Sequence, residues 1–108
     1  MDITQERQGQ TVVMAVNGRI DALAAKAFET TVGPVQTGEA ALLLDLGGLT
    51  YISSAGLRVI LLAAKQQKAK DAKFALCNLR DEVRDVFEIS GFAKILDIHP
   101  SREAALAA

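Results

Sequence analysis

The sequence predicts an α/β fold in one domain over residues 1–108, with a mixed, mostly parallel sheet of about five strands and about four helices. Short runs of strand-forming residues alternate with segments of helical periodicity, and this order is typical of parallel strands joined by helical crossovers. The first two runs, residues 3–8 and 11–16, are separated only by the Gly9–Gln10 turn, which predicts an antiparallel hairpin.

The first helix is predicted to begin after Asp21, whose side chain can cap the segment 22–29. Gly33 and Pro34 follow closely, and proline cannot continue the helical hydrogen-bond pattern, so the helix is expected to end there. Helical spacing indicates that one face of this helix carries Leu23, Ala27 and Thr30 or Thr31.

The middle of the chain is predicted to hold a central strand and a second helix. Residues 40–46 form a continuous apolar run, which is typical of a strand covered on both faces. The glycines that follow, Gly47 and Gly48, are interpreted as a tight strand exit. Apolar residues then recur at helical spacing between residue 55 and residue 70, and they are Leu57, Ile60, Leu61 and Ala64.

A further strand and helix are predicted from residue 74 onward. Residues 74–79 are apolar, and Asn78 with Asp81 resembles a capping arrangement for the next helix. Gly91 is the glycine expected just past the end of that helix. The inward stripe of the helix is interpreted as Val83, Val86, Phe87 and Ser90.

Two weaker elements are predicted at the end of the chain. Residues 95–98 are expected to form a last short strand. Ser101 and Glu103 are expected to start an alanine-rich terminal helix.

The charge balance excludes several classes of partner. The chain has 12 basic and 13 acidic residues and a formal charge of −1, so nothing electrostatic favours nucleic acid or an anionic membrane. No apolar run reaches the ~18 residues of a membrane span, and residues 1–6 lack the basic and apolar regions of a signal peptide. A cytoplasmic location is therefore expected, with no nucleic acid and no membrane as partner.

Catalysis, cofactors and metal ions are disfavoured by the residues present. Cys77 is the only cysteine and lies in an apolar run, so it is expected to be inert core. His99 is the only histidine, which makes a metal site improbable. The segment 53–56 lacks the first glycine of a nucleophile elbow, and Gly47–Gly48 has no Walker lysine or dinucleotide spacing. The sequence predicts neither an enzyme nor a cofactor.

Two hydroxyls, Ser53 and Ser54, lie where a buried strand passes into a helix start. Unpaired N–H groups and the helix dipole at such a start would stabilise a phosphoryl group on either serine. The alternative is a simple helix cap, which the residue types alone favour. Asp21 and Asp45 are expected at the same end of the sheet and could form a small acidic rim. The alternatives are helix capping for Asp21 and a solvated loop position for Asp45.

Three segments of the chain resemble the anti-sigma factor antagonist family, the bacterial regulatory members of the STAS domain superfamily. Residues 45–62 resemble the family's central motif, residues 16–21 its Gly-x-Leu-Asp element, and residues 83–92 its third helix and glycine end. The segments occur in the right order, and the match covers nearly the whole chain. The resemblance implies that residues 1–108 form a single STAS domain.

The family's motif is Asp-Ser-Ser-Gly or Asp-Ser-Thr-Gly, and its first hydroxyl accepts phosphate from a partner kinase. Laid on this chain, Ser54 takes the acceptor position, Ser53 replaces the aspartate and Ala55 replaces the second hydroxyl. The resemblance implies a cycle in which the unmodified protein binds an anti-sigma factor serine kinase and frees a sigma factor. Phosphorylation of Ser54 ends this binding, and a metal-dependent serine phosphatase resets it.

The partner surface that this resemblance implies surrounds the phosphoacceptor. One of the residues expected there, Leu57, has the alternative of packing in the hydrophobic core instead of contacting a partner. A second hypothesis keeps the STAS fold but makes the chain an unphosphorylated accessory subunit of a transporter or a sensory complex, and a small hydrolase using Ser54 ranks below both. The residues expected at the partner surface are Asp21, Ser53, Ser54, Ala55, Gly56, Leu57 and Arg58.

Overall fold

A five-stranded sheet forms the centre of the computed structural model, which describes residues 1–36, 38 and 40–108. The strands follow one another across the sheet in chain order, with β1 antiparallel to β2 and all other neighbours parallel. The described strands are β1 (Asp2–Gln8), β2 (Thr11–Ile20), β3 (Ala41–Ile52), β4 (Phe74–Cys77) and β5 (Ile98–His99). The predicted mixed sheet and its opening hairpin are confirmed.

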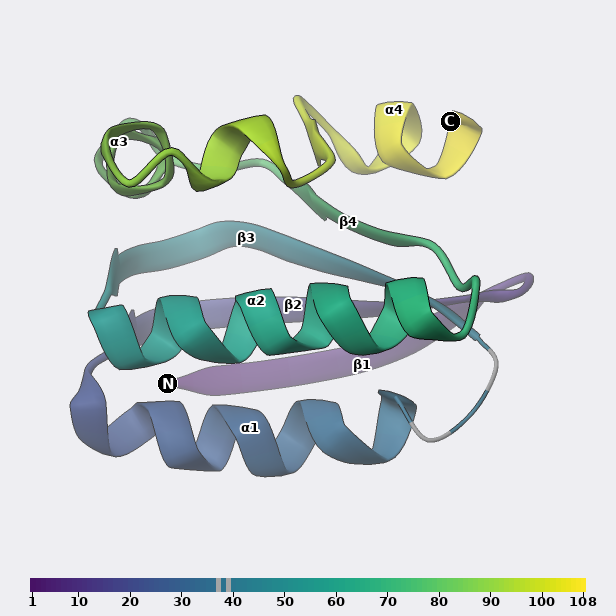
Figure 1. Ribbon diagram of the computed structural model, residues 1–108, viewed down its shortest axis with the longest axis horizontal. Helices are drawn as coiled ribbons and strands as arrows, with labels where there is room; N and C mark the ends of the chain where they lie inside the picture. The colour runs from purple at the N-terminus through teal and green to yellow at the C-terminus, as the bar shows by residue number, and fades with distance from the viewer. Residues whose placement is uncertain (37, 39) are drawn as a thin grey trace.

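Helices connect the parallel strands and cover the sheet (Figure 1). Within the described residues these are α1 (Ala22–Gln36), α2 (Ser54–Ala69), α3 (Asp81–Ile89), the short 3₁₀ helix η1 (Phe92–Lys94) and α4 (Arg102–Ala107). The predicted α/β class with four α-helices is confirmed for this part of the chain.

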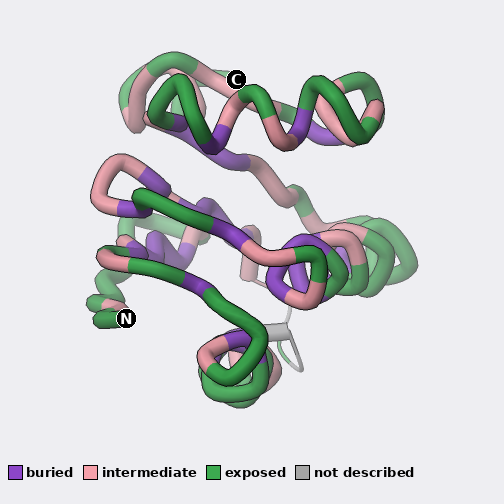
Figure 2. Tube along the Cα trace, turned by 90° about the vertical axis from the view of Figure 1, so that its left-hand side faces the viewer, coloured by how far each residue is buried: buried purple, intermediate pink, exposed green. Residues whose placement is uncertain are grey.

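The two faces of the sheet are covered unequally. Helices α1, α2 and α3 pack on one face and share its large apolar core, to which they contribute Phe28, Ile60 and Phe87. The other face carries a smaller cluster of Val13, Leu43 and Cys77, against which Ala105 of α4 packs. Figure 2 shows buried stretches along the strands and mixed burial along the helices, as this layered arrangement requires.

The first helix is longer than predicted. It continues through Pro34 to Gln36. Pro34 lies in the last turn, so the hydrogen bond that it cannot donate and the crowding of its ring are confined to the helix end. The face predicted from helical spacing is the exposed one, since Leu23 is 89 % exposed and Ala27, Thr30 and Thr31 are exposed as well. The face that packs on the sheet instead carries Ala25, Phe28 and Val32.

The third strand is longer than predicted and extends to Ile52, so Gly47 and Gly48 lie inside it rather than at a tight exit. Strand β2 runs alongside β3 over this length, with Asn17 opposite Gly48 across a register shift. A side chain at position 48 would collide with the Asn17 side chain. The glycines therefore allow close strand pairing here, and pairing supplies the hydrogen bonds that keep the backbone extended.

The predicted capping role of Asn78 is wrong. Strand β4 ends at Cys77, and Asn78 has a left-handed backbone with φ of 61°, which asparagine tolerates better than most residues. Its amide donates to Oδ1 of Asp45 over 3.2 Å. Helix α3 begins after Arg80, whose side chain makes no cap hydrogen bond. The predicted helix end at Gly91 is confirmed by its φ of 82°.

The predicted strand over residues 95–98 is wrong for residues 95–97, which form a turn and irregular backbone between η1 and β5. Helix η1 ends at Lys94, and only Ile98 and His99 pair with β4. The predicted terminal helix is confirmed, since Ser101 Oγ accepts a hydrogen bond from the N–H of Ala104 over 3.1 Å.

Candidate functional site

The two serines lie at one end of the sheet, where β3 passes directly into α2 (Figure 1). The N–H of Ser53 donates to the carbonyl oxygen of Ile20 over 2.8 Å, which ties this junction to the end of β2. Ser53 has an extended backbone, and its Oγ accepts a hydrogen bond from the N–H of Gly56 over 3.2 Å. Ser53 is therefore the N-cap of α2. The helix-cap interpretation is correct for Ser53.

Ser54 has a different environment from its neighbour. It is the first residue of α2 and is exposed, whereas Ser53 is half-buried. The N–H groups of the first helical turn have no intrahelical acceptors, and the helix dipole adds partial positive charge there. An anionic group on the Ser54 hydroxyl would thus be favoured by the helix start without displacing the Ser53 cap.

Gly56 holds the helix start close to the sheet. A Cβ atom at this position would lie 2.8 Å from Cγ2 of Ile20 and 2.8 Å from Cγ1 of Ile52, and carbon atoms of real side chains do not approach this closely. Glycine therefore lets the first turn of α2 rest directly on the ends of β2 and β3. This contact positions the Ser54 hydroxyl relative to the sheet.

Charged and aromatic side chains surround the helix start. The guanidinium carbon of Arg19 lies 4.4 Å from the centroid of the Tyr51 ring, and the two residues are paired across β2 and β3. Arg58 is exposed and stands four residues after Ser54, so both lie on one face of α2. Oδ1 of Asp21 accepts from the N–H of Ala24 over 2.8 Å, which confirms its capping alternative.

The residues expected at the partner surface divide into exposed and buried groups. Ser54, Arg58 and Asp21 are exposed, and Ala55 is half-buried like Ser53. Gly56 is buried, and Leu57 is only 7 % exposed and belongs to the main core. The alternative core position of Leu57 is the correct one, because its position on the helix turns the side chain toward the sheet.

Two exposed apolar residues at this end of the sheet were not expected from the sequence. Leu23 lies at the start of α1, and Tyr51, which is 41 % exposed, lies next to the end of β3. Figure 1 shows that α1 and α2 begin at the same end of the sheet. Simple strand alternation does not identify Tyr51, because Thr50 and Tyr51 are both exposed between buried Leu49 and Ile52, beside a register shift between β2 and β3.

Asp45 is not a solvated loop residue and does not join an acidic rim with Asp21. It lies within β3, seven residues before Ile52, where Nε of Arg102 donates to its Oδ2 over 2.6 Å. Burial disfavours its charged form, but hydrogen bonds from Arg102, the Gly47 N–H and Asn78 outweigh this effect and hold the pKa of Asp45 below its ordinary value. The role of Asp45 is to anchor α4.

Cys77 and His99 lie away from the serines. Cys77 is fully buried, and burial together with the nearby Asp45 charge raises the pKa of its thiol to about 11. This confirms the expected core position, and the raised pKa disfavours the reactive thiolate. Among the described residues, no three histidine, cysteine or acidic side chains gather into a group that could hold a metal ion. In the same part of the chain, no helix is long and apolar enough to cross a membrane.

Comparison with known proteins gives a consistent result over the whole chain. Residues 2–105 match the family model of the STAS domain. BtrV of Bordetella bronchiseptica, named as an anti-sigma factor antagonist, is 43 % identical over 109 aligned positions, which cover 100 % of this chain and 94 % of BtrV.

Solved structures share the fold described above. The crystal structure of an anti-sigma factor antagonist from Mycobacterium paratuberculosis has a TM-score of 0.91 at 24 % identity and covers 98 % of this chain and 91 % of that protein. The Bacillus cell fate determinant SpoIIAA in its phosphorylated form has a TM-score of 0.75 at 20 % identity, covering 98 % of this chain and 97 % of SpoIIAA.

Proposed function

Because the chain belongs to the STAS domain family and to its anti-sigma factor antagonists, we propose that it is a phosphorylation switch acting through partner exchange. The unmodified protein binds an anti-sigma factor that is also a serine kinase, and this binding frees a sigma factor. Phosphorylation of Ser54 ends the binding, and a metal-dependent serine phosphatase restores it. The chain itself acts by binding and not by catalysis.

The observation that carries this proposal is the difference between the two serines. Ser53 Oγ is engaged as the cap of α2, whereas Ser54 is exposed on the first turn. A kinase can therefore reach the Ser54 hydroxyl without unfolding the helix start. The core contacts of Gly56 and Leu57 lie beneath this position and hold the acceptor on a rigid support.

The charge of a phosphate explains how the switch would work. A phosphoserine carries about −1.5 to −2 charges, which a helix start with Arg58 one turn away can accommodate in water. The same charge is costly when it is desolvated against a closely packed partner. Phosphorylation would therefore leave the fold intact while weakening the complex, and the phosphorylated form of SpoIIAA shares the fold of this chain.

The exposed residues near Ser54 would form the contact surface for the kinase. Arg58 and Asp21 supply charges of opposite sign, and Tyr51 and Leu23 add apolar area at the same end of the sheet. Exposed apolar side chains contribute nothing to the core of the isolated domain, but they can contribute binding free energy when a partner covers them. We include both in the proposed surface in place of Leu57.

The test is phosphorylation of the whole protein by its anti-sigma factor kinase and ATP, with the phosphate located by mass spectrometry. We expect one phosphate on Ser54, none on Ser54→Ala, and continued modification of Ser53→Ala. In a binding titration, Ser54→Ala should keep wild-type affinity, and Ser54→Asp should bind at least about tenfold more weakly, which corresponds to ~1.4 kcal/mol. A tight complex that leaves wild type unmodified would instead support an unphosphorylated accessory subunit.

A further inference from the structure

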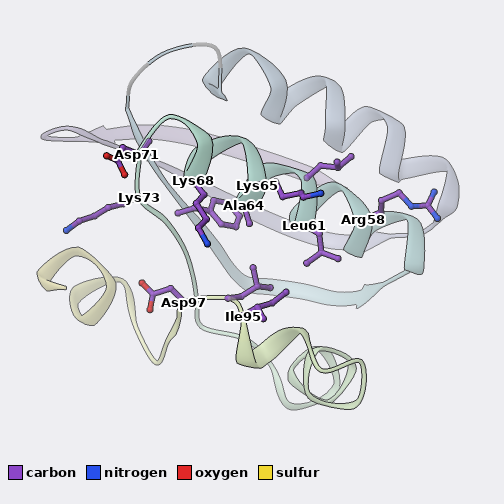
Figure 3. A pocket seen from close by; sticks show the side chains of 13 residues that line it. Arg58, Leu61, Ala64, Lys65, Lys68, Asp71, Lys73, Ile95 and Asp97 are labelled. Carbon is purple, nitrogen blue, oxygen red and sulfur yellow. The ribbon is translucent and has the colours of Figure 1, made fainter.

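A groove runs beside α2 on the side that faces η1 and β5 (Figure 3). Its volume is about 860 Å³, which is large enough to hold several side chains of a bound peptide. The wall formed by α2 extends from Arg58 past Lys68, and Ile95 stands on the opposite wall. The groove is separate from the buried contacts that support Ser54, although Arg58 borders both regions.

Apolar side chains line the groove from both walls. Leu61 and Phe74 are half-buried, while Leu62 is 41 % exposed and Ile95 is 71 % exposed. An exposed isoleucine opposite an exposed leucine leaves apolar area in water that a ligand could cover. Covering apolar surface is favourable by about 25 cal/mol per Å² before the costs of association, so a ligand that buries these side chains would gain binding free energy.

Positive charges are spread along the α2 wall rather than gathered at one point. Arg58, Lys65 and Lys68 are exposed and line the groove at intervals of seven and three residues. Ten residues of helix rise by ~15 Å, so the three charges follow the length of the groove. Figure 3 shows these side chains in sequence along α2. The ion pairs found among the described residues do not involve any of the three. The rest of the lining adds the positive charge of Lys73 and the negative charges of Asp71 and Asp97, so the groove carries four basic and two acidic side chains and stays positive overall.

We propose that this groove binds an acidic amphipathic helix of another protein. A helix lying along the groove would place leucine-type side chains between Leu62 and Ile95 and would present glutamate or aspartate to Arg58, Lys65 and Lys68. About 15 Å of contact corresponds to three helical turns, which offer one acidic residue per turn. A small amphiphile with one carboxylate would neutralise a charge at one end only, so the spacing favours the helix.

The test is titration of the ¹⁵N-labelled whole chain with a synthetic 18-residue helical peptide that has leucines on one face and glutamates beside them. We expect amide shifts at Leu62, Lys65, Lys68 and Ile95. The double variant K65E/K68E should bind at least tenfold more weakly, and Ile95→Ser should bind severalfold more weakly. Neither readout involves the kinase or Ser54, so the outcome is separable from that of the phosphorylation switch.

Two controls make the result decisive. Lys26→Glu changes an exposed lysine of α1 away from the groove and should bind the peptide like wild type. A matched peptide with lysines in place of the glutamates should not bind. The proposal is overturned if the glutamate peptide fails to bind, or if it binds K65E/K68E as well as wild type. It is also overturned if palmitate, an amphiphile with a single carboxylate, shifts the same amides without the peptide.

Discussion

Arg102 of the terminal helix donates from Nε to Oδ2 of Asp45, in the middle of β3, over 2.6 Å, and the same guanidinium contacts Glu6 of β1. The contact joins residues that are 57 positions apart in the chain. It holds α4 against the less covered face of the sheet, beside the small cluster that contains Cys77. This ion pair has a structural role and lies away from the proposed switch.

Acidification should lower the free energy of unfolding, and part of this loss should come from protonation of Asp45. Because its folded pKa lies below the ordinary value of about 3.9, the carboxylate stabilises the fold fully above that value. The stabilisation is lost as the pH falls through the lower folded pKa. Urea unfolding at several pH values should show Asp45→Asn losing less stability on acidification than wild type.

The contribution of the Asp45–Arg102 ion pair to the free energy of unfolding can also be measured at neutral pH. Asp45→Asn should lower the free energy of unfolding by about 1–2 kcal/mol, a value reduced because the Arg102 side chain is partly exposed. Arg102→Met should cause a similar loss, and the double variant should lose little more. Fully additive losses in this cycle would contradict a direct interaction.

Gly56 should be intolerant of a side chain. Gly56→Ala should lower the free energy of unfolding by about 1–3 kcal/mol, because the added Cβ collides with Ile20 and Ile52. Gly33→Ala is the matched control, since Gly33 also lies in a helix and an added Cβ meets no atom within 4 Å. The control should gain about 0.5–1 kcal/mol from helix propensity. Equal changes in thermal unfolding would refute the packing argument.

Ser53 and Ser54 should differ in their effect on stability. Ser53→Ala removes the cap of α2 and should cost about 1 kcal/mol, while Ser53→Asp should keep most of that free energy because aspartate also caps well. Ser54→Ala should change stability by less than about 0.5 kcal/mol, as expected for an exposed position. Denaturant midpoints of the three variants test this order.

Cys77 should resist thiol reagents in the folded protein. Its pKa of about 11 leaves little thiolate at pH 8, and its burial blocks access as well. Reaction with a disulfide dye should be slow in buffer and fast in denaturant. Rapid labelling without denaturant would indicate that α4 leaves the sheet easily.

Much of the fold follows from local pattern. The hairpin, the central strand and the helix with Leu57 and Ile60 were predicted because apolar periodicity and turn residues act over a few neighbours. The family resemblance directed attention to Ser54, but residue types alone could not separate its role from that of Ser53. Their separation needed the position of the Gly56 N–H.

The sequence by itself determined the order of the elements, the serine pair at a helix start and the absence of a strong charge, because these depend on residues close together in the chain. The tertiary structure decided which serine caps α2, which face of α1 is buried, and that Asp45 pairs with Arg102. It also decided that β3 continues through Gly47 and Gly48, since β2 lies alongside. These outcomes depend on contacts between distant segments, whose partners no local pattern specifies.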